Sequence, residues 1–447
     1  MDGTPPRATL TPAADAVFVG EHTQLTAVFD GDSASIDGIG PVQSGVAVDT
    51  PALSRTTTFR LRVVLGDAEA EAQATVRANY RNRIRVLADA PIAQTNHVAA
   101  ALPDGRAIVM GGNTSASLLV PDSTLSQIFD PAREKFTAGP DLMFSAQAQQ
   151  FTSFATLETG GFLLVGSGIN GPPRGPPQFV VTQQFDPATS KFTRTGDAFT
   201  ASTSVRTAAP LSDGGALLTG GLTGRPSPVN NVVDRYDAVS AQWRSATPML
   251  HVRVLHTATR LNDGRVLVVG GLSCCQFPNP STEFFTNTAE IYDPALDRFT
   301  PTGTMTVARG GHAAAVLPDG RVLIAGGSGN DPATAPRGTE IFDPATGQFS
   351  PGGDLQAARD SHAAVTLADG RVLVIGGEVP SVVAGRSGVG IPATEIFDPS
   401  TGLWTAGPTL HPAFFAATVT MLGNGKVLVF GGQDAGGFPV AKVAIFE

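Results

Sequence analysis

Three arginines at equivalent positions offer the most specific chemistry in this chain. Arg253, Arg309 and Arg359 recur in register in the second half of the sequence. A guanidinium binds a carboxylate or a sulfate through two parallel hydrogen bonds, so a cluster of guanidiniums would suit an acidic ligand. Three other polar residues lie near them in the sequence: His251, Asp360 and His411. We therefore predict that these six residues contribute to a ligand-binding site.

The same recurrence supports a second interpretation of the arginines, and it is the one that the recurrence favours. Residues that return at one repeat position commonly serve the scaffold, and these arginines would then bond to backbone carbonyls. Histidines also return at one position of the repeat: His97, His256, His312 and His362. A metal site needs converging ligands, whereas a repeat places these four residues in separate units. We therefore predict a packing role for them and no metal site.

Cys274 and Cys275 are the only cysteines, and they are adjacent. In an oxidising compartment they would form a vicinal disulfide, a rigid apolar platform for a ligand. As free thiols they would instead support redox or soft-metal chemistry. A third interpretation is that they are ordinary loop residues. We include both cysteines among the predicted ligand-binding residues.

No catalytic constellation can be recognised in the sequence. It contains no Gly-x-Ser-x-Gly elbow, no His-Glu-x-x-His helix and no phosphate-binding loop. Glu283, Asp331 and Glu378 remain unassigned candidates for glycoside chemistry, because carboxylate pairs are recognised by their separation in space. The catalytic residues are therefore unknown, and no cofactor is predicted.

Seven internal repeats must position these residues. Each repeat has a leucine that begins a Leu-x-Asp-Gly turn or a degenerate copy of it, at Leu102, Leu157, Leu211, Leu261, Leu317, Leu367 and Leu422. A glycine follows nine residues after each leucine, and all but one of these glycines begin a pair. An aromatic residue with an acidic neighbour comes next, at Phe129, Phe185, Tyr236, Tyr292, Phe342, Phe397 and Phe446. Apolar runs between these turns predict a four-stranded antiparallel unit in each repeat.

The outer strand of the last unit is predicted at the other end of the repeat region. Trp243, Phe299 and Phe349 each precede the next recurring histidine by 13 residues, and Ile84 precedes His97 by the same number. We therefore predict that residues 82–87 complete the last unit. This pairing would close a ring and leave no long sheet edge exposed.

One repeat contains the full series of motifs: Arg309, His312, Asp319-Gly320-Arg321, Gly326-Gly327, Phe342-Asp343-Pro344 and Phe349. This series resembles the kelch-repeat β-propellers, and the resemblance extends over residues 82–447. It implies an all-β fold with a seven-bladed propeller at 81–447. Galactose oxidase is similar in having such a ring beside an immunoglobulin-like domain. Its copper-radical residues cannot be mapped here, since the tyrosines are Tyr80, Tyr236 and Tyr292, and two of them hold the repeated aromatic position.

Residues 1–80 lack the repeat and consist of short runs of strand-forming residues. We predict a small β-sandwich, which resembles the immunoglobulin-like domains of bacterial exported proteins. No cysteine lies in this region, so no disulfide can join its sheets. It would bind a glycan or a partner, or act as a spacer that holds the propeller away from a surface. The spacer role is the one we favour.

Composition and charge limit the function classes. The 447 residues carry a net charge of −9 with no long basic run, so a nucleic-acid partner is not expected. No apolar stretch is long enough to span a membrane, and no signal peptide is recognised at the start. We predict a monomeric, secreted or surface-tethered bacterial-type protein that binds an acidic carbohydrate or a protein partner on the long-loop face of the propeller. The alternatives are a galactose-oxidase-like carbohydrate-active or oxidative enzyme with a diverged site, and a purely structural surface protein.

Overall fold

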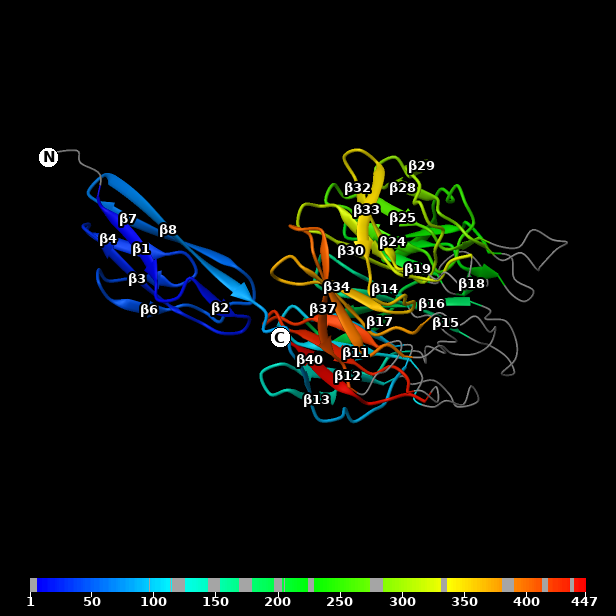
Figure 1. Ribbon diagram of the computed structural model, residues 1–447, viewed down its shortest axis with the longest axis horizontal. Coiled ribbons are helices and arrows are strands. Elements are labelled where there is room, and N and C mark those ends of the chain that lie inside the picture. The colour runs from blue at the N-terminus through cyan, green and yellow to red at the C-terminus, as the bar shows by residue number, and fades with distance from the viewer. Residues whose placement is uncertain are drawn as a thin grey trace.

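The computed structural model describes most of the chain. The described ranges are residues 6–95, 97–112, 114, 125–143, 153–168, 179–196, 203–204, 206–223, 229–273, 284–330, 336–379, 390–411, 417–434 and 438–447. All regular elements in these ranges are strands, which confirms the predicted all-β class (Figure 1). Within the same ranges no helix has the length and apolar character that a membrane crossing requires.

Two sheets form the N-terminal unit. One contains β1 (Ala8–Pro12), β3 (Gln24–Phe29) and β6 (Ala47–Asp49). The other contains β2 (Ala16–Phe18), β8 (Ala68–Asn79), β7 (Thr57–Leu65), β4 (Ser33–Ile36) and β5 (Gly40–Pro41), in that order. Every second residue of β7 is apolar, so Leu61 and Val63 point inward and pack against Leu25 and Ala27 of the facing sheet. The two sheets therefore share one core.

Most of the remaining strands form seven four-stranded antiparallel sheets, numbered here along the chain. Sheets 1 to 4 are β10 (Val98–Ala101), β11 (Ala107–Met110), β12 (Ser126–Asp130), β13 (Lys135–Ala138); β14 (Ser153–Thr156), β15 (Phe162–Gly168), β16 (Phe179–Asp186), β17 (Lys191–Arg194); β19 (Thr207–Pro210), β20 (Ala216–Thr219), β22 (Val233–Asp237), β23 (Gln242–Ser245); and β24 (Thr257–Arg260), β25 (Val266–Val269), β28 (Ala289–Asp293), β29 (Arg298–Pro301). Sheets 5 to 7 are β30 (Ala313–Val316), β31 (Val322–Ala325), β32 (Gly338–Asp343), β33 (Gln348–Asp354); β34 (Ala363–Thr366), β35 (Val372–Ile375), β36 (Ala393–Asp398), β37 (Leu403–Thr409); and β38 (Thr418–Met421), β39 (Val427–Phe430), β40 (Val443–Phe446), β9 (Ile84–Val86).

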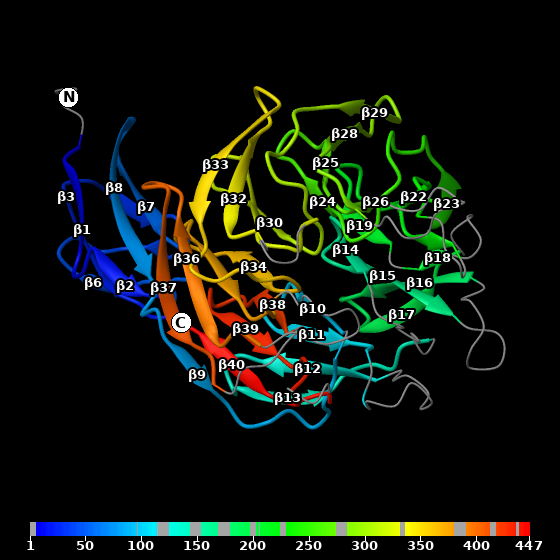
Figure 2. The same cartoon turned by 45° about the vertical axis from the view of Figure 1, so that its right-hand side comes forward.

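These sheets are arranged in a closed ring. The first strand of each sheet contacts the first strand of the next, and β38 of sheet 7 contacts β10 of sheet 1. The outer strand of sheet 7 is β9, with Ile84 opposite Phe446, and Figure 2 shows it beside β40. We predicted this outer strand at residues 82–87, and in the structure it is β9, Ile84–Val86. The arrangement is in keeping with a β-propeller-like fold.

The two ends of the ring differ in their connections. At the turn end, the Leu-x-Asp-Gly turns join the first and second strands of each sheet. At the loop end lie the glycine pairs and the linkers that enter the next sheet. Two small two-stranded sheets extend sheets 3 and 4 there: β18 (Thr203–Ser204) pairs with β21 (Leu222–Thr223), and β26 (Leu272–Ser273) forms a hairpin with β27 (Phe284–Phe285). Figure 1 shows the N-terminal unit and β18 at opposite ends of the molecule.

Close packing between sheets explains the recurring glycines. Gly270 and Gly326 both have positive φ, 62° and 64°. A Cβ atom on Gly270 would lie 2.5 Å from the carbonyl oxygen of Arg309, and one on Gly326 would lie 2.5 Å from that of Arg359. The linker of the following sheet passes over each glycine, so a side chain has no room there.

Candidate functional site

The three predicted arginines are fully buried at the loop end of sheets 4, 5 and 6, each with 0% exposure. Arg309 donates from Nη1 to the carbonyl oxygens of Gly326 at 3.0 Å and Gly338 at 2.8 Å. Its Nη2 donates to Glu340 Oε1 at 3.1 Å. Arg359 makes the equivalent bonds in sheet 6, including one of 2.7 Å to Glu395. Each guanidinium therefore ties its own linker to the second and third strands of its sheet.

The acidic partners were missed in the sequence, although a signal was present. Glu290, Glu340 and Glu395 each lie two residues before a recurring aromatic, in the same register as the arginines. Glu290 Oε1 accepts a bond of 2.6 Å from Arg253, and its Oε2 accepts one of 2.6 Å from the backbone N–H of Leu250. The buried acid thus holds the linker at a second point.

These contacts correct the ligand-binding prediction for Arg253, Arg309 and Arg359. Both terminal nitrogens of each guanidinium are engaged inside the protein, and none of the three side chains presents a surface to an anion from solvent. We therefore assign the three arginines a structural role, which is the second interpretation given in the sequence analysis. In sheet 3 the pair Arg206 and Asp234 takes this place, with the arginine three residues further along the repeat.

The remaining predicted residues are dispersed. His251 is 48% exposed on its side chain, and its Nδ1 lies 3.8 Å from Glu290 Oε1. His411 is exposed just after β37. In the described part of the chain no hydrogen bond or ion pair joins either histidine to Asp360. Cys274 and Cys275, together with Glu283 and Asp331, lie outside the described residues.

The recurring histidines lie in separate sheets, and three of the four, His97, His256 and His312, bond to threonines. His256 Nε2 lies 2.8 Å from Thr219 Oγ1, and His312 Nε2 lies 2.9 Å from Thr257 Oγ1. Burial, with a smaller contribution from Arg309, lowers the pKa of His312 to about 3, so its imidazole is neutral. Among the described residues no group of three or more histidine, cysteine, aspartate and glutamate side chains could hold a metal ion.

Asp360 lies in the linker that enters sheet 6, at the loop-end opening of the ring, which we call the mouth. Its side chain is only partly accessible, because Oδ1 is buried and has no hydrogen-bond partner among the described residues. Asp360 is half-buried, and its Oδ2 accepts a hydrogen bond from Ser328 Oγ of sheet 5. Its backbone pairs with that of Glu378 through two bonds of 3.1 Å. Burial raises the pKa of the Asp360 carboxyl, and the hydroxyls of Ser328 and Ser361 oppose this shift.

Strained linkers hold Asp360 at this mouth. Leu255, Gly311 and Ser361 occupy equivalent linker positions, and all have positive φ, at 57°, 66° and 51°. The backbone N–H of Gly311 donates to Leu255 at 3.0 Å, and that of Ser361 donates to Gly311 at 3.3 Å. A left-handed leucine or serine costs roughly 1 kcal/mol, and strain of this kind persists where the surroundings enforce it. The linkers of sheets 4, 5 and 6 are thereby joined side by side.

An aromatic hairpin packs against the linker that enters sheet 5, which lies beside the linker that holds Asp360. Phe284 of β27 is 52% exposed, and Phe285 packs over Gly310, where an added Cβ would lie 2.7 Å from its ring. Asn330 of sheet 5 accepts a bond of 2.6 Å from the N–H of Phe285 and donates one of 3.1 Å to its carbonyl oxygen. We call this group of residues the mouth site: Phe284, Phe285, Ser328, Asn330 and Asp360.

The mouth site combines an exposed aromatic side chain with a partly buried carboxylate, a hydroxyl and an amide, and these polar groups bond within the protein, Ser328 to Asp360 and Asn330 to Phe285. Apolar surface with a few placed polar groups is the usual composition of a binding site for a small molecule. A carboxylate accepts hydrogen bonds from hydroxyl groups, and an amide both donates and accepts them. The sequence indicated Asp360, but Phe284 and Asn330 belong to loops without a repeat.

Comparisons with known proteins address the fold alone. No family model and no curated protein matches the chain. A solved structure described as YjhT, a β-propeller-like protein, superposes with a TM-score of 0.51 at 14% sequence identity. The match covers 66% of this chain and 92% of that chain. This solved structure of similar fold thus supports the all-β, β-propeller-like class of the ring.

Proposed function

We propose that the protein is a recognition protein that binds a carbohydrate at the mouth site. In this proposal residues 81–447 form a seven-bladed kelch propeller, and residues 1–80 form an immunoglobulin-like domain. The seven repeats in constant register, and seven four-stranded sheets in a closed ring, support the kelch assignment. The protein acts outside the cytoplasm as a monomer.

The ligand in this proposal is a neutral carbohydrate rather than an acidic one. The acidic ligand was inferred from Arg253, Arg309 and Arg359, which are buried in ion pairs. The one observation that carries the new assignment is a chain of contacts: the hairpin with the exposed Phe284 bonds to Asn330, two residues after Ser328, and Ser328 bonds to Asp360. A sugar presents an apolar ring face to an aromatic side chain and hydroxyls to a carboxylate.

Thermal unfolding of the intact chain with neutral and acidic oligosaccharides tests this proposal. A ligand that binds only the native state stabilises it by about 2.7 kcal/mol at a hundredfold excess over Kd. We expect one family of neutral sugars to raise Tm, and calorimetric titration to give its Kd. Phe284→Ala and Asp360→Asn should each weaken binding at least tenfold, which is about 1.4 kcal/mol.

Asp319→Asn is the matched control, because Asp319 is an exposed aspartate at the turn end that bonds to Arg321 at 2.7 Å. It should bind the sugar as the parent does. Binding of acidic sugars alone, or unchanged binding by Phe284→Ala and Asp360→Asn, would refute the mouth site. Chemical turnover of the bound sugar would favour the enzyme alternative, and binding of a protein partner alone would favour protein recognition.

A further inference from the structure

The turns at the turn end touch one another around six of the seven junctions of the ring. A Cβ atom on the turn glycine of sheet 5, Gly320, would lie 2.8 Å from Asn262 in the turn of sheet 4. The equivalent contact in sheet 6 is between Gly370 and Pro318, also at 2.8 Å. The same relation holds for four more pairs: Gly105 with Gly423, Gly160 with Pro103, Gly214 with Glu158, and Gly264 with Ser212. In each pair the contact is with the residue that follows the turn leucine of the neighbouring sheet.

The junction between sheets 6 and 7 is different. The atoms nearest to a Cβ on Gly425 belong to Ser54 and Val19 of the N-terminal unit, with Val19 Cγ1 at 2.8 Å. The hydroxyl of Tyr80 donates to the carbonyl oxygen of Gly425 at 2.5 Å and accepts from the N–H of Ala368 at 3.1 Å. Ala368 follows Leu367, so it is the equivalent of Asn262 and Pro318. Tyr80 therefore stands between the two positions that touch directly at the other junctions.

The Tyr80 side chain is held as part of a core. It is 5% exposed, and its ring centroid lies 5.4 Å from that of Phe446. Burial raises the pKa of its hydroxyl to about 12, so the hydroxyl remains a donor at physiological pH. Leu61 of the N-terminal unit belongs to the same buried apolar cluster as Leu373 and Val427 of sheets 6 and 7. One core thus runs from the N-terminal unit into the ring.

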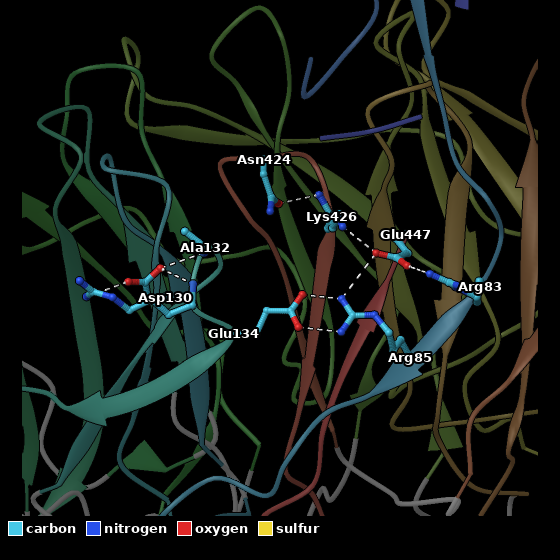
Figure 3. Close-up of polar contacts among 9 residues, drawn as sticks. Arg83, Arg85, Asp130, Ala132, Glu134, Asn424, Lys426 and Glu447 are labelled. Carbon is cyan, nitrogen blue, oxygen red and sulfur yellow. Dashed lines mark hydrogen bonds and ion pairs between the residues drawn. The ribbon is translucent and has the colours of Figure 1, made fainter. Parts of the chain in front are cut away.

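Charged residues fix the chain that follows Tyr80. Arg83 and Lys426 both pair with Glu447, and Lys426 Nζ lies 2.6 Å from its Oε2 (Figure 3). Burial alone would raise the pKa of Glu447, but the hydrogen bonds from these two cations outweigh it and hold the pKa at about 2. Arg85 donates to both oxygens of Glu134 and so ties β9 to the β12–β13 turn of sheet 1. The segment from Tyr80 to Arg85 therefore contacts sheet 7 and sheet 1, the two sheets between which the ring closes.

We infer that the turn ends of sheets 6 and 7 form a docking surface whose occupant is the N-terminal unit of the same chain. The N-terminal unit fills the one junction that the turns leave open, with Tyr80 as the bridging residue. This inference differs from the spacer role expected from the sequence, because a spacer shares no core with the part it carries. It predicts that the N-terminal unit and the ring unfold together.

Hydrogen exchange and calorimetry on the full chain test this inference. The unmodified protein should unfold in one transition. In Tyr80→Phe the amide of Ala368 loses its acceptor, so exchange in residues 365–371 and 421–428 should become about tenfold faster, which is about 1.4 kcal/mol. Exchange in β31 of sheet 5 should not change. Tyr292→Phe is the control, because that hydroxyl bonds to Asp297 within its own sheet, at 2.7 Å.

Two results would overturn the inference. One is unchanged exchange in residues 365–371 and 421–428 of Tyr80→Phe. The other is a separate, earlier unfolding of the N-terminal unit in the unmodified protein, with these two segments still protected. The second measurement needs no variant, so it decides the matter even if a more severe substitution such as Tyr80→Ala fails to fold.

Discussion

The loop end and the turn end of the ring are built from the same repeats, but they hold their charges differently. At the loop end, Arg309 and Glu340 form an ion pair that is almost entirely buried. At the turn end, Arg321 and Asp319 form an ion pair that is about half exposed. A buried charge that loses its partner is strongly destabilising, whereas an exposed pair contributes little. The loop end is therefore a rigid frame on which long, unequal loops can vary.

Removing one partner from each pair should give the largest difference between the two ends. Glu340→Ala leaves the Arg309 guanidinium buried without a carboxylate, and we expect a loss of about 3–5 kcal/mol in the free energy of unfolding. Asp319→Ala, the matched change at the turn end, should cost about 1 kcal/mol or less. Urea denaturation of the two variants measures both values. Equal losses would mean that the buried pair is not what holds the linkers.

Replacing a glycine by alanine should also destabilise the protein more at the loop end than elsewhere, but the difference should be smaller. Gly270 at the loop end has positive φ and no room for a Cβ, whereas Gly402 has positive φ of 72° and open space around it. Gly270→Ala combines backbone strain with a steric clash and should destabilise by about 3 kcal/mol. Gly402→Ala has the backbone strain alone and should cost about 1 kcal/mol. If the two Tm values fall by the same amount, packing between sheets is looser than the distances indicate.

The smallest effect concerns a hydrogen bond that one loop-end junction lacks. His312 bonds to Thr257 of the preceding sheet, and His97 bonds to Thr418 in the same way. His362 faces sheet 5, where the equivalent residue is Ala313, and its Nε2 has no partner among the described residues. Ala313→Thr should add the missing bond and stabilise by about 1 kcal/mol. Thr257→Ala should cost a similar amount, and a destabilised Ala313→Thr would show that His362 has no space for a hydroxyl.

The repeat made the architecture of the ring predictable. Turns, glycine pairs and aromatics at constant spacing predict strands and their order, because each mark has a local steric reason. Phe342 and Phe349, for example, lie directly opposite each other in a hairpin, which explains their spacing of seven. The outer strand at residues 84–86 followed from the same register.

The site was less predictable, for two physical reasons. An arginine that recurs has the same sequence signature whether it binds a ligand or a carbonyl, and only the acid in register, such as Glu290 for Arg253, distinguishes the two. Phe284 and Asn330 belong to loops with no period, so nothing in the sequence indicated that these loops meet near the linkers of sheets 5 and 6. Tyr80 lies outside the repeat, and its partner Gly425 is 345 residues away in the chain.

The position of Tyr80 also breaks the symmetry of the ring. Seven similar sheets around an axis define no preferred direction about that axis, so a ligand at the mouth would have no fixed orientation relative to the rest of the molecule. Tyr80, between sheets 6 and 7, makes one junction of the ring different from the other six, and this junction defines an orientation about the ring axis. Because the mouth site spans sheets 4 to 6, its orientation relative to the N-terminal unit is set by the fold. Under the proposed function, anything attached to that unit would approach the ligand from one defined side.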